Sequence, residues 1–213
     1  EKLIARNCSD IMTATQKMTD KLRSWGAKGK IHRVPSCVDV EFFNFYENHR
    51  KRIRTELNIK NSDCLIVYLG KFGGMYMEDE AIQFFKACLD TENSRFKILI
   101  LSHDDPERIK NLFRKYEISD NDWFFKRSLR EEVPHYLSAA DYGFVAVRQK
   151  PSKRYCSPIK DGEYWSCGLP IIIPKGISDD YLLAEENRIG IVMEDVTNQS
   201  FSKVIIEMEE NLK

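Results

Sequence analysis

The sequence has no apolar run near the roughly 20 residues that a membrane-spanning helix needs, and it has no excess of either charge. Its 33 basic residues balance its 33 acidic residues, so no net field draws the chain to nucleic acid. No signal peptide is recognisable, and the chain opens at Glu1 without methionine, which predicts a piece cut from a longer protein. With 42% hydrophobic residues, the 213-residue chain can bury a core as one large domain, or as one domain plus part of another.

Several motifs of common site classes are also missing. The six cysteines form no CxxC pair and no metal-ligand spacing, which favours a chain of reduced thiols in the cytoplasm. The glycine-rich stretch at residues 70–74 matches neither the GxGxxG dinucleotide fingerprint nor a P-loop. Asp120, Asn121 and Asp122 spell an acid–x–acid pattern, but their turn-rich surroundings favour an ordinary turn. We therefore expect no metal site and no cofactor.

Strand and helix patterns alternate six times from residue 64 onwards. Apolar runs predict strands at residues 65–69, 96–101, 123–125, 142–147, 169–173 and 189–193, and apolar residues at helical spacing predict a helix after each strand. The short connections favour an α/β fold with a doubly wound, mostly parallel sheet and helices on both faces. In such a sheet, ligands bind at the carboxyl ends of the strands.

The first third of the chain has a different pattern. It predicts a strand at 10–14, a helix ending near Trp25 and a strand at 30–34, followed by a linker without helical period. Residues 49–57 read as a basic helix with only two apolar positions, which favours a solvated surface helix over a membrane-bound one. We therefore divide the chain into residues 1–34, a linker and basic helix at 35–63, and a main domain at 64–213.

Residues 157–174 read as a helix start, a short helix, a glycine stop and a buried strand. Ser157 suits the N-cap, and Pro158 suits the first helical position. Lys160 and Glu163 share one face of this helix. A lysine near the positive end of a helix dipole is unfavourable unless an anion binds there, whereas a carboxylate one turn later can accept hydrogen bonds from a diol. The pattern indicates phosphate beside ribose or sugar; the alternative is a solvated Lys–Glu pair.

Two further loops follow predicted strands and carry candidate residues. Residues 70–74, GKFGG, form a flexible loop whose amides and Lys71 can approach a phosphate or a sugar, with a tight turn as the alternative. The loop after residues 123–125 carries two basic residues and a serine, which can read a base edge or bring charge towards phosphates. An ordinary surface loop is the competing interpretation there.

Residues 157–171, SPIKDGEYWSCGLPI, resemble the donor-site signature of GT-B glycosyltransferases of family 4 type, often written SPxKxxEYxxxGxPV. The stretches VPSCVD at 34–39 and YLGK at 68–71 resemble the linker and a strand end of the same family, in the same order. The resemblance covers nearly the whole chain. It implies the Rossmann-like, donor-binding C-terminal half of a GT-B fold, with residues 1–34 as the end of an acceptor-side domain whose main body is missing.

The resemblance also implies an activity, namely retaining, metal-independent transfer of a hexosyl group from a UDP- or GDP-type nucleotide-sugar. The acceptor would be a glycan or a lipid-linked glycan of polysaccharide or glycoconjugate biosynthesis. Lys71 would contact the diphosphate and Glu163 the ribose hydroxyls, and Lys71, Lys160 and Glu163 are the candidate catalytic residues. We expect the isolated piece to be inactive and to lie in the cytoplasm, with peripheral association at the inner face of a membrane left open.

The residues expected to contact the donor lie in the two loops described above and in the stretch around the predicted helix start at Ser157: Gly70, Gly73, Gly74, Lys126, Arg127, Ser128, Tyr155, Cys156, Ser157, Pro158 and Ile159. Two positions depart from the family pattern. Tyr155 stands where a glutamate is common, and Met75 and Tyr76 stand in the region of a second phosphate lysine, for which Lys160 is the proposed substitute. The first departure keeps a second hypothesis open, a non-catalytic nucleotide-binding α/β module. The sequence does not specify the sugar, the base, the acceptor or the oligomeric state.

Overall fold

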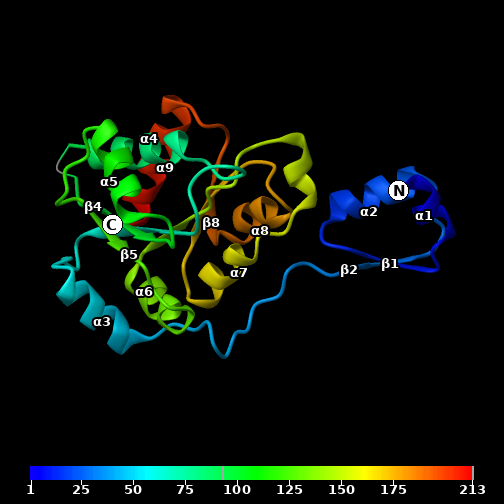
Figure 1. Cartoon of the computed structure of the whole chain (residues 1–213), viewed down its shortest axis with the longest axis horizontal. Coiled ribbons are helices and arrows are strands. Elements are labelled where there is room, and N and C mark those ends of the chain that lie inside the picture. Colours follow the sequence, from blue (N-terminus) through cyan, green and yellow to red (C-terminus); the bar gives the residue numbers. More distant parts are fainter. Residues whose placement is uncertain (93, 213) are drawn as a thin grey trace.

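The computed structural model describes residues 1–92 and 94–212, and its larger part is a six-stranded parallel sheet (Figure 1). The strands are β3 (Cys64–Leu69), β4 (Phe96–Leu101), β5 (Trp123–Lys126), β6 (Tyr142–Phe144), β7 (Ile171–Pro174) and β8 (Gly190–Met193). They lie in the order β5-β4-β3-β6-β7-β8. This is the doubly wound order, in which the direction of winding reverses between β3 and β6. The predicted fold class is confirmed.

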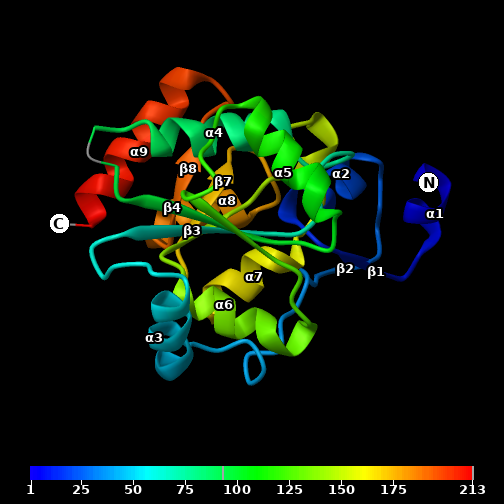
Figure 2. The same ribbon diagram turned by 60° about the vertical axis from the view of Figure 1, so that its left-hand side comes forward.

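Helices cover both faces of the sheet (Figure 2). One layer holds α4 (Asp79–Leu89), α5 (Pro106–Lys115) and α9 (Asn198–Asn211), and the other holds α3 (Glu47–Glu56), α6 (Val133–Ala139) and α7 (Ile159–Ser166). A further helix, α8 (Asp180–Asn187), packs against β7 and β8. Alternate residues of β3 enter the two cores, because successive side chains of a strand point to opposite faces. Both faces of the sheet are therefore buried, as its near-continuous apolar strands require.

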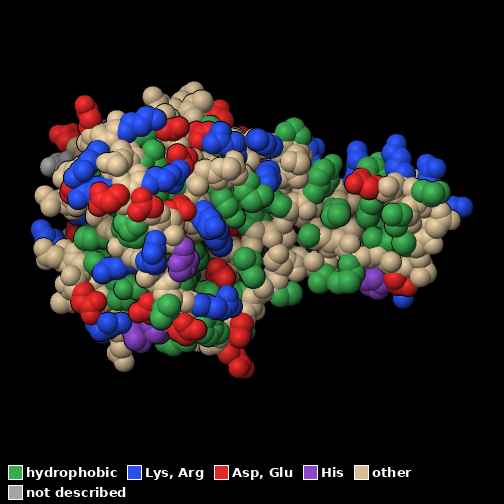
Figure 3. All heavy atoms as spheres, in the orientation of Figure 1, with side chains coloured by type: hydrophobic (Ala, Val, Ile, Leu, Met, Phe, Trp, Pro, Cys, Tyr) green, Lys and Arg blue, Asp and Glu red, His purple; other side chains and the backbone are tan. Residues whose placement is uncertain are grey.

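A smaller body precedes the sheet and lies beside it (Figure 1). It consists of α1 (Lys2–Asn7), β1 (Asp10–Thr13), α2 (Gln16–Ser24) and β2 (Lys30–Arg33), with β1 and β2 paired in parallel. Figure 3 shows hydrophobic side chains on its surface, and Leu3, Ile4 and Met12 are 75%, 66% and 68% exposed. Two strands and two short helices cannot bury such side chains among themselves.

Side-chain hydrogen bonds tie the smaller body and the linker to the larger one. The Ser36 amide donates to Ser157 Oγ at 2.9 Å, and Ser36 Oγ donates to the Ser157 carbonyl at 2.6 Å. The Thr15 hydroxyl donates to the Arg154 carbonyl at 3.0 Å. Asp179, directly before α8, accepts two hydrogen bonds from the N-terminal body. The loop that precedes α7 is therefore held from both sides.

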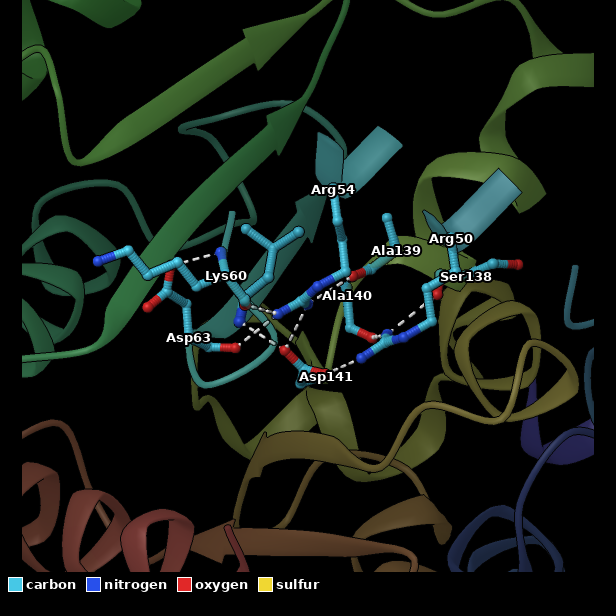
Figure 4. Close-up of polar contacts among 9 residues, drawn as sticks. Arg50, Arg54, Lys60, Asp63, Ser138, Ala139, Ala140 and Asp141 are labelled. Carbon is cyan, nitrogen blue, oxygen red and sulfur yellow. Dashed lines mark hydrogen bonds and ion pairs between the residues drawn. The ribbon is translucent and has the colours of Figure 1, made fainter. Parts of the chain in front are cut away.

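Helix α3 is attached to the sheet by a buried ion network (Figure 4). Asp141 pairs with Arg50 at 2.6 Å and with Arg54 at 3.0 Å, and it also accepts the Leu65 amide at 2.8 Å. Arg54 is only 4% exposed. The prediction of a solvated basic helix is thus wrong for these two arginines, because the network places them against the start of β6.

None of the helices in the described part of the chain combines the length and the apolar character that a membrane-spanning segment needs.

The ends of several predicted elements differ from the structure, and two of these differences lie near the candidate residues. Helix α7 has Pro158 rather than Ser157 as its N-cap, since the Ser157 hydroxyl already accepts the Ser36 amide. Strand β6 ends at Phe144 rather than at residue 147. Beyond that point the chain pairs instead with the loop after β3, through an antiparallel bridge between Tyr76 and Val147.

Candidate functional site

The three candidate catalytic residues line one hollow at the carboxyl ends of the central strands. This hollow, called here the β3–β4 hollow, has a volume of about 310 Å³ and is lined by Lys71, Lys160 and Glu163. The other predicted residues on its wall are Gly70, Ser128 and Ile159. Residues from three loops and from α7 thus meet at the edge of the sheet where α/β proteins bind ligands.

A second hollow of about 290 Å³ adjoins the first. This β3–β6 hollow lies where the strand order reverses, between the ends of β3 and β6, and the predicted residues on its wall are Cys156, Ser157, Pro158, Ile159 and Lys160. The two hollows share Leu69, Ile159 and Lys160. The start of α7 therefore lies between two connected spaces, with the Lys160 side chain at their border.

Helix α7 is fixed at this position by Tyr164. The Tyr164 ring is fully buried, and its hydroxyl accepts the Leu69 amide at 2.9 Å, directly before the loop that carries Lys71. The ring packs on Gly143 of β6, where a Cβ atom would lie only 2.6 Å from Tyr164 Cγ. A glycine at residue 143 therefore allows α7 to approach the sheet and to bring Lys160 and Glu163 to the ends of the strands.

The Lys71 loop is held by hydrogen bonds to the end of β4 and to the loop that follows β4. The Gly70 amide donates to the Leu101 carbonyl at 2.9 Å, and the Phe72 amide donates to Asp104 Oδ2 at 2.7 Å. Gly70 has a φ of +139°, in the range that favours glycine. Lys71 itself is exposed, so its ammonium group remains accessible to a ligand.

Glu163 is buried without a hydrogen-bonded or charged partner among the described residues. Glu163 is 7% exposed, and this burial raises the pKa of its carboxyl group. The positive charges of Arg130 and Lys160 lower the same pKa by a smaller amount. A buried carboxylate needs donors to offset its lost hydration. Because Glu163 faces the β3–β4 hollow, the hydroxyl groups of a ligand can supply them.

Five predicted contact residues do not line either hollow. Gly73 and Gly74 form a turn with φ of +84° and +64°, and Gly73 faces the Glu78–Arg108 ion pair. Lys126 is the last residue of β5, and Arg127 donates to the His103 and Asp104 carbonyls, so that it joins two loops. Tyr155 instead lines an apolar hollow on the N-terminal body.

Three further residues of the site are not among the predicted contact residues. Arg130, Ser102 and His103 line the β3–β4 hollow. Arg130 lies over the Phe42 and Phe43 rings, with its guanidinium carbon 5.3 and 5.6 Å from their centroids. These partners come from the linker, about 90 residues earlier in the chain. His103 comes two residues after a predicted strand, a position that predicts either a donor to a ligand or, as the favoured interpretation, a cap of the next helix. In the structure the N-cap of α5 is Asp105, and His103 lines the hollow.

Larger hollows lie elsewhere, including one of about 470 Å³ beside Gln149 and Ser178. One of about 750 Å³ lies at the amino ends of β6, β7 and β8, and one of about 760 Å³ lies on the N-terminal body. Neither is lined by Lys71, Lys160 or Glu163. The 750 Å³ hollow carries charged side chains, among them Arg50, Asp141 and Arg188, but it lies at the edge of the sheet opposite the one where α/β proteins bind ligands. Within residues 1–92 and 94–212, no cluster of three or more His, Cys, Asp or Glu side chains is placed to hold a metal ion.

A family model described as "Glycosyl transferases group 1" matches residues 49–213. No curated protein sequence matches the chain significantly.

Solved structures share the fold. Sucrose-phosphate synthase from Thermosynechococcus elongatus is 19% identical, with a TM-score of 0.74 over 99% of this chain and 51% of that one. Anabaena HepE, solved in complex with UDP-glucose, is 13% identical, with a TM-score of 0.73 over 98% of this chain and 56% of that one. The C-terminal domain of a group 1 glycosyl transferase, LpcC from Francisella tularensis, is 17% identical, with a TM-score of 0.60 over 82% of this chain and 87% of that one. The chain thus spans about half the length of the first two.

Proposed function

The chain belongs to the glycosyl transferases group 1 family and has the Rossmann-like fold of the C-terminal half of a GT-B glycosyltransferase, and from this premise we propose that it binds the nucleotide-sugar donor of a retaining, metal-independent hexosyltransferase. The observation that carries the proposal is the meeting of Lys71, Lys160 and Glu163 in one hollow at the carboxyl ends of the strands. A UDP- or GDP-type donor fits the proposal, and the printed title of the HepE structure names UDP-glucose as that protein's ligand.

Each part of the donor has a matching group in the two hollows. Lys71 and Lys160 supply positive charge for the diphosphate, and Glu163 accepts hydrogen bonds from the ribose hydroxyls. The sugar then lies in the β3–β6 hollow, beside the loop that ends at Ser157. As the bond to the sugar breaks, negative charge grows on the departing diphosphate, and the ammonium groups of Lys71 and Lys160 stabilise it.

The division of the chain follows from the same proposal. Residues 64–213 form the donor-binding domain, residues 35–63 form the linker and α3, and residues 1–34 belong to an acceptor-side domain. The acceptor, a glycan or lipid-linked glycan, would be held by that domain across a cleft. We therefore expect the 213-residue chain alone to bind the donor without transferring sugar. Its cytoplasmic location remains a prediction.

Isothermal calorimetry of the 213-residue chain with UDP, GDP and ADP tests the proposal. We expect one of these to bind, and we expect Lys71→Ala and Glu163→Ala each to weaken that binding by about tenfold or more, since hydrogen bonds to charged groups are involved. Lys51→Ala, an exposed lysine on α3, serves as the control and should leave affinity unchanged. Unchanged affinity in both site variants, with unchanged melting temperature, contradicts the proposal.

A non-catalytic nucleotide-binding module is the second candidate function. One observation favours it: Tyr155 faces the hollow on the N-terminal body and does not line the β3–β6 hollow. The two functions differ in a single measurement on the full-length protein. Release of nucleotide from donor in the presence of acceptor indicates the transferase, and tight donor binding without release indicates the module.

A further inference from the structure

We propose that Tyr76 is a positioning residue, which holds the Lys160 ammonium group at the border of the two hollows so that it binds the phosphates of a nucleoside diphosphate. The inference rests on the proposed function and names a residue that the sequence reading did not assign to the site. Lys160 Nζ lies 4.6 Å from the centroid of the Tyr76 ring. The two residues come from separate segments, α7 and the loop after β3.

The end of the Lys160 side chain packs against Gly70. A Cβ atom at residue 70 would lie 2.5 Å from Lys160 Nζ and 3.1 Å from its Cε. The end of the lysine side chain therefore crosses the bare backbone of Gly70, and the Tyr76 ring bounds its ammonium group. These two contacts restrict a side chain that is otherwise among the most flexible in proteins.

Tyr76 is itself fixed to the sheet. Its amide donates to the Gly73 carbonyl at 3.1 Å, and its backbone bridges to Val147 beyond β6. The next amide, that of Met77, donates to the Ala146 carbonyl at 2.7 Å. The backbone that carries the Tyr76 ring is therefore hydrogen-bonded to the segment that follows β6. The turn through Gly73 and Gly74, which does not line the hollows, has a role here because it brings residue 76 back to them.

The aromatic contact leaves the charge of Lys160 available. Among residues 1–92 and 94–212, no carboxylate forms an ion pair with Lys160, although Asp161 and Glu163 are close enough for its charge to lower their pKa values against the effect of burial. A π face attracts an ammonium group without neutralising it or occupying its N–H donors. A carboxylate in the place of Tyr76 would cancel the positive charge that a phosphate requires.

Calorimetric titration of the 213-residue chain with UDP, GDP and ADP, using whichever binds, tests the inference in four variants. Tyr76→Leu keeps bulk but removes the π face, and we expect it to weaken binding about threefold to tenfold, in the range of cation–π contacts. Tyr76→Phe keeps the face and should stay within about twofold of the wild type. In a Lys160→Gln background, Tyr76→Leu should have no further effect, because the group that it positions is gone.

The same titrations separate a positioning role from a structural one. The inference is wrong if Tyr76→Leu weakens binding equally with and without Lys160, or if Tyr76→Leu binds with wild-type affinity. In either case the proposed function still stands if Lys160→Gln alone weakens binding. Binding of none of the three nucleotides by the wild-type chain rejects both. Melting temperatures of all variants identify any loss that comes from unfolding.

Discussion

Asp161 is a buried carboxyl group one residue from Lys160, and it has an unusual neighbour. It is 1% exposed, and no N–H or O–H group of the described residues donates to its oxygens. Its carboxyl group instead faces that of Asp180, so a hydrogen bond between the two requires a proton on one of them. Burial, followed by the charge of Asp180, raises the pKa of Asp161 well above its usual range. The pair connects the start of α7 to the start of α8.

This pair predicts a pH-dependent loss of stability. Above about pH 4, an unfolded aspartate releases its proton, whereas folded Asp161 retains it, so the free energy of unfolding falls as pH rises towards the folded pKa. Asp161→Asn keeps a donor towards Asp180 and cannot ionise. We expect its stability, measured by urea unfolding from pH 4.5 to 8, to fall less steeply than that of the wild type.

Asp120→Asn is the matched control, because the Asp120 side chain is 51% exposed. Its curve should run parallel to that of the wild type. An Asp161→Asn curve that is also parallel would show that the pair does not hold a proton in this pH range.

At the scale of elements, the position of α7 depends on close packing against β6. Gly143→Ala would place a methyl group within 2.6–2.8 Å of three Tyr164 ring atoms in the buried core. Because such overpacking costs about 1–3 kcal/mol, we expect thermal unfolding at a lower temperature and weaker nucleotide binding as α7 shifts. Gly162→Ala is the control: its nearest contact is 3.3 Å, to Val38, and alanine favours the helix. Equal stability of the two variants would contradict this account of α7.

The attachment of α3 depends on one carboxylate at the start of β6 (Figure 4). Asp141→Asn leaves Arg54, with a side chain 5% exposed, without its counter-charge. Removing one partner of a buried pair costs about 3 kcal/mol or more, and we expect that loss in chemical denaturation. Asp90→Asn, which removes an exposed i,i+4 pair with Lys86, should change stability by less than about 0.5 kcal/mol. A similar small effect of Asp141→Asn would show that the network contributes little.

At the scale of the whole molecule, the loop before α7 is where the smaller body meets the larger one. Ser36→Ala removes the hydroxyl that donates to the Ser157 carbonyl. We expect faster amide hydrogen exchange at residues 150–157 and little change in the sheet, since weakly held segments open locally. Ser202→Ala, on the exposed side of α9, is the control. Unchanged exchange before α7 would show that this contact does not hold the loop.

The two bodies also give the molecule its surface pattern. Hydrophobic side chains lie on the surface of the N-terminal body, among charged ones (Figure 3). The assignment of residues 1–34 to an acceptor-side domain remains a proposal, and it accounts for these side chains as surface that a complete domain would cover.

The α/β class and the order of strands and helices can be predicted from the sequence, because buried parallel strands and amphipathic helices have different apolar periods. The sequence also indicated the start of α7 and the pairing of Lys160 with Glu163 on one face, since these depend on local spacing. Local rules could not predict the turn of Arg50 and Arg54 towards Asp141, which lies some 90 residues away in the chain.

Which candidate residues lie together depends on the folding of distant segments onto one another. This folding placed Lys71, Lys160 and Glu163 in one hollow, and it placed Tyr155 elsewhere. It also brought Arg130 to the site from a segment that carried no signal of its own, and it placed Tyr76, which stands in the region of the family's second phosphate lysine, against Lys160. The physical reason is that strand order and the close contact of Gly143 with Tyr164 set these distances, and both depend on pairings between residues far apart in the sequence.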